Sequence, residues 1–187
     1  KRVLAYFACD LYNVYMTTQL NGAETVFLPF NQGSNGAGKD GGAGNPTTED
    51  GKYVTSYFWE NVLQKDKLLD ILQKFISYER SEKKKIMPDG STKTTVSSKV
   101  IFPRYHQLDV VRKLVSHVRE NGAGHNYLIQ HSAGSGKSNS IAWTAYRMAS
   151  LHDENNNPIF DSVIIVTDRR VLDQQLQATV SGFDHTL

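Results

Sequence analysis

Residues 131–138 read HSAGSGKS, a run of small residues that ends in Lys and Ser. The general phosphate-loop pattern is Gly, any four residues, and then Gly-Lys-Ser or Gly-Lys-Thr. Gly136-Lys137-Ser138 fits the end of that pattern, whereas His131 stands where the pattern has its first Gly. The N–H groups of such a loop and the start of the helix that follows it attract anions. The stretch therefore predicts a phosphate-binding turn, and an ordinary Gly-Ser turn is the alternative.

The residues around this loop favour a strand, a loop and a helix in succession. NYLIQ at 126–130 is a short apolar run, and KSNSIAWTAYRMAS at 137–150 has helical periodicity. Its predicted buried face consists of Ile141, Ala145 and Met148. SVIIVT at 162–167 is a continuous β-branched run, typical of a parallel strand covered on both faces, and 169–180 is a further predicted helix. This βαβα order predicts an α/β fold with a parallel sheet and right-handed crossovers.

The predicted loop supplies candidate ligands for a nucleotide. N–H groups that can turn toward phosphates belong to Ser132, Ala133, Gly134, Ser135 and Gly136. Lys137 can reach the outer phosphates, and the hydroxyl of Ser138 can bind Mg²⁺. The loop by itself therefore predicts a bound nucleotide with Mg²⁺, and the family resemblance described below implies that the nucleotide is ATP. A similar run at 36–39 is followed by Asp40 and further glycines, which indicates a mobile loop without such a site.

FPRYHQ at 102–107 lies upstream of the loop and ends in Gln107. A Gln amide can pair with the adenine edge, donor to acceptor and acceptor to donor. Arg104 and Tyr105 are near enough in sequence to stack on the base. Gln107 is therefore a candidate adenine-binding residue, and a plain polar residue at a helix start is the alternative.

TDRRVLDQQ at 167–175 follows the second predicted strand. Thr167 or Asp168 can cap the helix, and Arg169 and Arg170 then lie in its first turn, where cations oppose the helix dipole. A nucleic-acid phosphate offers compensation for the two arginines, and the family resemblance described below implies that Asp168, Arg169 and Arg170 lie in a segment that contacts the DNA backbone. An ion pair with Asp168 or Asp173 is the equally open alternative.

Composition sets broad limits on the class of protein. The 187 residues suffice for one or two small domains, and 21 Lys and Arg against 19 Asp and Glu give a net charge of +2, which does not by itself indicate a nucleic-acid binder. The single cysteine, Cys9, excludes an internal disulfide and predicts a reduced, cytoplasmic setting. No apolar run is long enough to predict a membrane segment. The chain begins mid-pattern without Met, so we expect a piece of a longer protein.

Three regions are predicted, at 1–78, 79–98 and 99–187. The first is β-rich, with a hairpin turn at Asn21-Gly22, and ends in helices. We expect Asp66 to cap the second of these helices, whose predicted buried face is Leu68, Leu69, Leu72, Phe75 and Ile76. The second region is a polar connector or hairpin, with a lysine run that favours solvent. The third begins with a helix, whose predicted buried face is Leu108, Val111, Val115 and Val118.

The order of these parts resembles the first motor domain of superfamily 2 helicases. Individual stretches of sequence make the resemblance more specific. Over nearly its whole length the chain resembles the restriction subunit of type I restriction-modification enzymes, in stretches that include VYMTTQL, FLPFNQG, RYHQLDVV, QHSAGSGKS and TDRRVLDQQL. The resemblance implies a type I site-specific deoxyribonuclease that translocates double-stranded DNA with ATP. It implies methylation and specificity subunits as partners. The fold implied is the distal part of a nuclease domain and then a truncated RecA-like P-loop domain.

Two features of that family are missing from this sequence. The Glu-x-Lys cluster of its nuclease site does not occur in residues 1–80, and Glu82-Lys83-Lys84 matches the spacing by chance in the polar connector. No strand-borne Asp-Glu pair follows Lys137, so the acidic box of the motor is absent as well. We therefore expect no catalytic residue in this chain. Another superfamily 2 translocase, a P-loop module of a different class and a non-catalytic interaction module are the alternatives.

Overall fold

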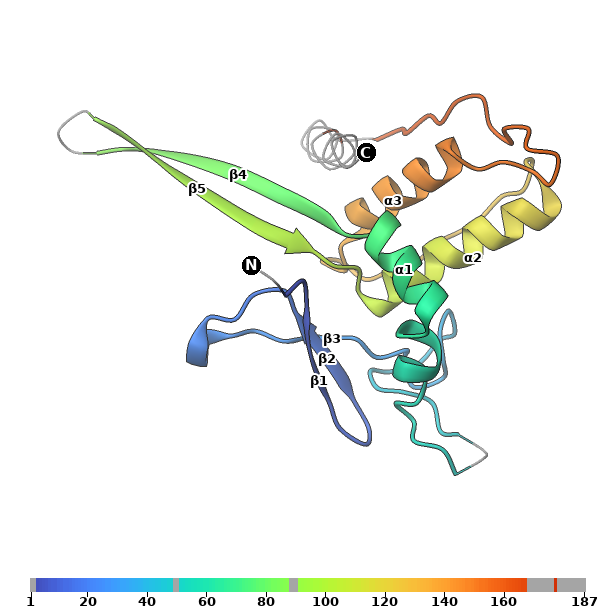
Figure 1. Ribbon diagram of the computed structural model, residues 1–187, viewed down its shortest axis with the longest axis horizontal. Coiled ribbons are helices and arrows are strands. Elements are labelled where there is room, and N and C mark those ends of the chain that lie inside the picture. The colour runs from blue at the N-terminus through green and yellow to red at the C-terminus, as the bar shows by residue number, and fades with distance from the viewer. Residues whose placement is uncertain (1–2, 49–50, 88–90, 168–176, 178–187) are drawn as a thin grey trace.

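The computed structural model describes residues 3–48, 51–87, 91–167 and 177. An antiparallel sheet near the N-terminus has the order β1-β2-β3, as Figure 1 shows. Its strands are β1 (Tyr6–Cys9), β2 (Val14–Thr17) and β3 (Leu28–Pro29). The three predicted β-rich runs therefore do form strands, although each is shorter than its apolar run.

The connection between β2 and β3 is longer than the two-residue turn predicted at Asn21-Gly22. It contains a short 3₁₀ turn, η1 (Gly22–Glu24). The Thr25 hydroxyl accepts from the Asn21 N–H at 2.8 Å and donates to the Gly22 carbonyl at 2.7 Å. These local bonds satisfy backbone groups that a tight hairpin would have paired across the strands, which explains the wider turn.

A π-helical turn, η2 (Phe58–Val62), precedes α1 (Lys65–Lys74). The prediction that Asp66 caps α1 is wrong, because Gln64 holds that position and its side chain accepts from the Lys67 N–H at 3.2 Å. The buried face of the helix also differs from the predicted one. Of the predicted face only Phe75 is fully buried, and Ile71 joins it, while Leu69 and Leu72 are 45% and 41% exposed.

The predicted polar connector forms a long hairpin. Its strands are β4 (Ser77–Ile86) and β5 (Thr92–Ile101), paired from Ser77 with Ile101 to Ile86 with Thr92. The hairpin projects away from the rest of the molecule in Figure 1. The base of the hairpin adjoins the start of α2. The end of β5 lines the same cavity as Gly134–Gly136, so the base of the hairpin lies next to the predicted phosphate loop.

Two helices carry the third region, α2 (Tyr105–Asn121) and α3 (Lys137–Ala149), and they pack against each other. The predicted buried face of α2 is confirmed at all of its positions: Leu108, Val111, Val115 and Val118. In α3 Met148 is buried as predicted, but Ala142 and Trp143 are buried in place of Ile141. Every helix in the described ranges is too short or too polar to cross a bilayer.

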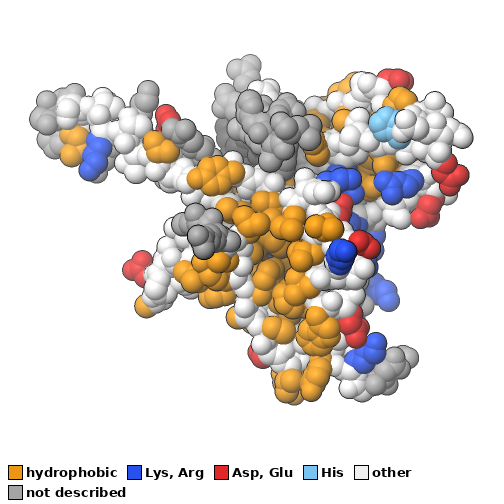
Figure 2. All heavy atoms as spheres, in the orientation of Figure 1, with side chains coloured by type: hydrophobic (Ala, Val, Ile, Leu, Met, Phe, Trp, Pro, Cys, Tyr) orange, Lys and Arg blue, Asp and Glu red, His pale blue; other side chains and the backbone are white. Residues whose placement is uncertain are grey.

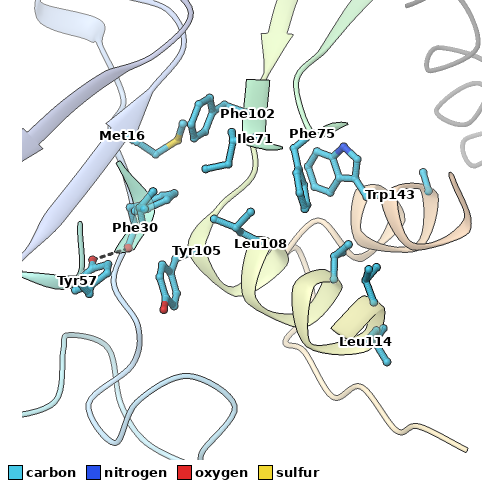
Figure 3. Close-up of a cluster of buried hydrophobic side chains, with 14 of the residues drawn as sticks. Met16, Phe30, Tyr57, Ile71, Phe75, Phe102, Tyr105, Leu108, Leu114 and Trp143 are labelled. Atoms are coloured by element: carbon cyan, nitrogen blue, oxygen red, sulfur yellow. Dashed lines mark hydrogen bonds between the residues drawn. The ribbon is translucent and has the colours of Figure 1, made fainter. Parts of the chain in front are cut away.

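Aromatic rings join the N-terminal sheet to α2. The Phe30 ring lies 5.4 Å from Phe7 and 5.8 Å from Tyr105, centroid to centroid, and Phe7 lies 5.6 Å from Phe102. The buried Tyr57 hydroxyl donates to the Phe30 carbonyl at 2.8 Å, as Figure 3 shows. This aromatic cluster fixes the first turn of α2 against the sheet, and that turn carries Gln107.

A charged junction joins the three α-helices. Asp70 of α1 accepts from Arg112 of α2 at 3.3 Å and from Arg147 of α3 at 3.0 Å. Both guanidinium groups lie over the Phe75 ring, which packs on Trp143 at 5.7 Å. Burial lowers the pKa of Arg147, which Asp70 opposes by attracting its charge.

The glycine-rich stretch at 31–46 forms hydrogen bonds within itself and with α2, and the mobility predicted for 36–39 stays a prediction. The Gly33 N–H donates to the Gly44 carbonyl at 2.8 Å. Lys113 of α2 donates to the Ala37 carbonyl at 2.9 Å. Side-chain amides close the loop at its base, where Asn45 donates to Asn31 at 3.0 Å. These contacts link the stretch to α2 and close it at its base.

The predicted parallel sheet is not present in the part of the chain that the structure describes. Residues 126–130 and 162–167 run without ladder pairing, and the two sheets that are described are both antiparallel. Outward-facing side chains along these stretches are strongly exposed: Leu128 94%, Ile164 83% and Val166 88%. A β-branched run becomes a strand only when neighbours pair with its backbone. The helix predicted at 169–180 lies outside the described residues, apart from Gln177.

Candidate nucleotide-binding site

The HSAGSGKS loop turns directly into α3, as its sequence predicts. Gly136 is the N-cap of α3 in the left-handed region, with φ of 81°, and Gly134 has φ of 74°. A Cβ at position 136 would lie 2.5 Å from the Gln107 side-chain nitrogen. The backbone angle therefore favours glycine at position 136, and a larger residue would also displace the Gln107 amide from the loop.

The Lys137 side chain reaches back across the loop to its first two residues. Its ammonium group donates to the His131 carbonyl at 3.0 Å and to the Ser132 carbonyl at 2.8 Å. The side chain is exposed, so an anion that approaches the loop meets its charge directly. Ser138 follows as the second residue of α3 and is half-buried. The loop, the lysine and the helix start thus share one surface, with positive charge from the ammonium and the helix dipole.

The loop residues differ in exposure. Ser132, Ala133 and Gly134 are exposed, whereas Ser135 is buried. Among the described residues, the Ser135 hydroxyl oxygen has no hydrogen-bond partner. A buried hydroxyl without a partner is costly, so this oxygen is a ready contact for a polar ligand. The exposed backbone beside it offers room for phosphates.

Gln107 is buried and bridges two parts of the site. Its carbonyl oxygen accepts from the Arg104 N–H at 2.8 Å, which caps the start of α2. Its amide nitrogen donates to the Gly136 carbonyl at 2.8 Å and to the Ser135 carbonyl at 3.3 Å. The amide therefore ties α2 to the phosphate loop, and its role toward adenine stays a prediction.

Two histidines meet beside the phosphate loop, His106 of α2 and His131 at the first position of the loop, and the sequence pattern gave neither a functional role. The His106 Nε2 lies 2.9 Å from the Ser135 carbonyl, and its ring meets the His131 ring edge to face at 4.9 Å. Burial lowers the pKa of His106. Burial, followed by the nearby Lys137 charge, lowers the pKa of His131. No local signal links these residues, because their contact spans 25 positions of the chain and depends on how α2 docks.

Three open cavities border the loop in the described part of the chain. One, of about 290 Å³, is lined by Arg104, His106 and residues 130–135. A second, of about 350 Å³, lies between Gly134–Gly136 and the N-terminal sheet. A third, of about 380 Å³, is mostly apolar and is lined by His131 and Lys137 as well as by residues of α3. Asp168, Arg169 and Arg170, the predicted DNA contacts, lie outside the described residues.

Comparison with known proteins gives one match. The SWI2/SNF2 ATPase family model matches residues 106–186, which begin in the first turn of α2 and include the phosphate loop and α3. No curated protein and no solved structure matches the chain. The match indicates a helicase-like ATPase region and with it the use of ATP. It does not extend to residues 1–105, and it carries no indication of nuclease activity.

Proposed function

We propose that this chain contains the ATP-binding start of a DNA-translocating motor, within the restriction subunit of a type I restriction-modification enzyme. The observation that carries the ATP site is the loop at 131–138, with Lys137 across it and Gln107 beneath it. It lies inside the region that matches the SWI2/SNF2 ATPase family model. Members of the superfamily use such a loop to hold the phosphates of ATP.

The residues present fit ATP and Mg²⁺. N–H groups of the loop from Ser132 to Gly136 would surround the phosphates, and Lys137 would leave its carbonyl contacts to meet the outer ones. The Ser138 hydroxyl would hold Mg²⁺, which when bound neutralises charge on the phosphate oxygens. The buried Ser135 hydroxyl supports this fit, because its oxygen has no hydrogen-bond partner among the described residues and a polar ligand could supply one.

The type I assignment rests on the resemblance of sequence stretches along the chain to the restriction subunit of that family. These stretches include some within residues 1–105, which the family match does not cover. Under this proposal residues 1–78 belong to a nuclease domain, 79–98 connect it, and 99–187 begin a RecA-like motor domain. Asp168, Arg169 and Arg170 would contact the backbone of double-stranded DNA. The methylation and specificity subunits of the complex would be the protein partners.

A SWI2/SNF2-type translocase without a nuclease is the second candidate, and the family match itself favours it. The two differ in one property of the whole protein. ATP-dependent cleavage of unmodified duplex DNA supports the type I assignment. ATP hydrolysis and translocation without cleavage support the second.

The ATP site is tested by titrating a fluorescent ATP analogue with Mg²⁺ against this chain and its Lys137→Ala variant. We expect saturable binding that weakens by about 10-fold or more when the ammonium is lost, because charge-assisted phosphate contacts are strong. Lys74→Ala, an exposed lysine in the last turn of α1, is the matched control and should leave binding unchanged. Equal binding by wild type and Lys137→Ala contradicts the proposed site.

A further inference from the structure

The hairpin of β4 and β5 is much more basic than the rest of the chain. Residues 77–101 contain six Lys and Arg against three Asp and Glu, a net charge of +3, whereas the remainder of the chain carries −1. The nearly neutral total therefore conceals one strongly basic element. A cluster of Lys and Arg on one element is typical of proteins that bind nucleic acid.

The register of the two strands divides these charges between two faces. Alternate residues of a strand belong to the same face, and directly paired residues share it. Beyond the base of the hairpin, the pairs on one face are Glu79 with Lys99, Ser81 with Ser97, Lys83 with Thr95 and Lys85 with Lys93. The ion pair of Glu79 with Lys99, at 3.0 Å across the ladder, agrees with this assignment. We call these eight positions the basic face.

The basic face contains only lysines, hydroxyl residues and one glutamate. Beyond the base, the apolar residues of the two strands all belong to the opposite face, where Tyr78, Ile86 and Val96 are exposed. Lys and Ser are depleted in interfaces between proteins, whereas Lys, Ser and Thr are common contacts to nucleic-acid phosphates. The composition of the basic face therefore favours a phosphate backbone as its partner over an apolar protein surface.

The hairpin is not covered by the rest of the described chain. Within the described ranges β4 and β5 form a two-stranded sheet of their own, and the hairpin projects from the molecule in Figure 1. The side chains from Thr92 to Lys99 are exposed on both faces. An isolated two-stranded hairpin is only marginally stable in water. Long strands without a cover therefore indicate a surface that a partner contacts.

The dimensions of the hairpin suit duplex DNA. Each strand has ten residues, and strands rise about 3.3 Å per residue, so the hairpin is roughly 30 Å long. The major groove of B-DNA is about 12 Å wide and admits a two-stranded ribbon. One turn of the duplex is about 34 Å long, so the hairpin can follow the phosphates over nearly a full turn.

We propose that the basic face of the β4–β5 hairpin binds the phosphate backbone of double-stranded DNA without regard to base sequence. Lys83, Lys85 and Lys93 supply the charge toward the tip, and the exposed Thr95 hydroxyl donates to a phosphate oxygen. Lys99 contributes less, because Glu79 already neutralises it. The choice of duplex DNA as partner rests on the proposed function, whereas the basic face itself follows from the strand register.

The first test measures binding of a short fluorescent duplex to the full chain by anisotropy. The triple variant Lys83→Gln, Lys85→Gln and Lys93→Gln should weaken binding by about 10-fold or more at about 0.1 M salt. The slope of log K against log salt concentration should fall by about 3, roughly one for each lost phosphate contact. Two duplexes of unrelated sequence should bind equally well. A triple variant with wild-type affinity and slope overturns the inference.

A control variant carries the same change in net charge elsewhere. Lys39→Gln, Lys65→Gln and Lys74→Gln remove three exposed lysines outside the hairpin and should preserve the wild-type affinity. An equal loss in this control would show an effect of total charge alone, which overturns the inference. Circular dichroism on each variant checks that the fold persists.

The opposite face of the hairpin provides a second control. Arg80 and Lys84 pair with Ser98 and Thr94, so they belong to the face that carries the apolar residues. Arg80→Gln with Lys84→Gln should cost less affinity per charge than the triple variant does. An equal loss per charge would show that DNA contacts both faces and overturns the assignment to the basic face.

Acetylation of lysines with and without saturating duplex, mapped by mass spectrometry, needs no variant. Bound DNA should protect Lys93 and leave Lys74 reactive, and unchanged acetylation of Lys93 overturns the inference. Polyglutamate tests an acidic protein as the partner instead of DNA. Tighter binding of polyglutamate than of the duplex overturns DNA as the partner.

Failure of this inference is distinguishable from failure of the proposed function. The triple variant should bind the fluorescent ATP analogue as wild type does, because its substitutions lie away from the phosphate loop. A chain that binds the analogue but no duplex overturns the inference and leaves the nucleotide site standing. Duplex binding that depends on the basic face, in a chain that binds no nucleotide, supports the inference and overturns the proposed ATP site.

Discussion

The aromatic cluster around Phe30 and the two extended stretches at 126–130 and 162–167 are both strongly apolar, yet they end in opposite environments. Phe30 is fully buried among rings from β1, η2 and α2. Ile164 and Val166 are almost fully exposed. Hydrophobicity alone therefore does not decide burial in this molecule. The availability of partners does.

The partners of Phe30 come from several segments that each bring one ring, so the cluster closes on all sides. The extended stretches instead border an apolar groove of about 380 Å³ on α3, lined by residues such as Ile129, Met148 and Ile165. Residues 163–166 border this groove, yet Ile164 and Val166 remain 83% and 88% exposed. Figure 2 shows that hydrophobic side chains also gather on the surface over the middle of the molecule. The closed cluster and the open groove thus differ in how many elements contribute to them.

Truncation of one residue in each region tests most directly whether the two regions differ in their contribution to stability. Phe30→Ala should lower the free energy of unfolding by about 3–5 kcal/mol, because it removes a ring that several others contact. Ile164→Ala should change it by less than about 0.5 kcal/mol, as expected for an exposed side chain. Urea denaturation of both variants measures the difference. Equal losses in the two variants would show that residues 162–167 are as well packed as the aromatic cluster.

A smaller loss is expected at the junction of the three α-helices. Asp70→Ala leaves Arg147, which is largely buried, and Arg112 without their carboxylate, and should cost about 2–3 kcal/mol, below the full value for a buried pair because Asp70 is partly exposed. The exposed pair of Glu60 with Lys52 offers the matched control, and Glu60→Ala should cost no more than about 0.5 kcal/mol. Thermal unfolding monitored by circular dichroism compares them. An Asp70→Ala variant as stable as wild type would show that the charged junction does not contribute to the free energy of unfolding.

A single hydrogen bond within the aromatic cluster should contribute less again. Tyr57→Phe leaves the Phe30 carbonyl without the buried hydroxyl and should lower the free energy of unfolding by about 1–2 kcal/mol. Tyr53→Phe, at an exposed ring, is the control and should have no measurable effect. Chemical denaturation resolves a difference of this size, and no difference would place the Tyr57 contribution in ring packing alone.

The sequence predicted what depends on neighbours along the chain. The buried face of α2 follows from its periodicity, and the turn from Gly136 into α3 follows from the loop pattern. It did not predict the contact of Gln107 with Gly136, or the place of Met16 and Thr18 beside the loop, because these depend on how segments far apart dock. The strand predicted at 162–167 shows the opposite error, since a strong local propensity met no paired neighbour in the described residues.

Acid should weaken the loop region before it affects the aromatic cluster. The folded-state pKa values of His106 and His131 are lowered, chiefly by burial, so the unfolded chain binds protons first as the pH falls below about 6.5. Stability contributed by the neutral imidazoles is complete above that pH and declines below it, until the folded chain is protonated too. Urea midpoints at pH 7.5 and 5.5 should differ less in His106→Gln than in wild type. His152→Gln, in an exposed loop, should retain the wild-type difference.

The smallest effect on stability, and the most specific test of the open groove, is expected from the double variant Ile164→Lys and Val166→Lys. Both side chains are strongly exposed, so their replacement should shift the free energy of unfolding by less than about 0.5 kcal/mol. Unpaired extended backbone with exposed β-branched side chains favours association between chains, and charges on such an edge oppose it. Light scattering over a concentration series should therefore show self-association in wild type and less of it in the double variant. A wild type that stays monomeric at high concentration would mean that the exposed apolar side chains at 162–167 do not cause association between chains. The burial of the aromatic cluster would then follow from the number of rings that can pack there and not from a need to avoid aggregation.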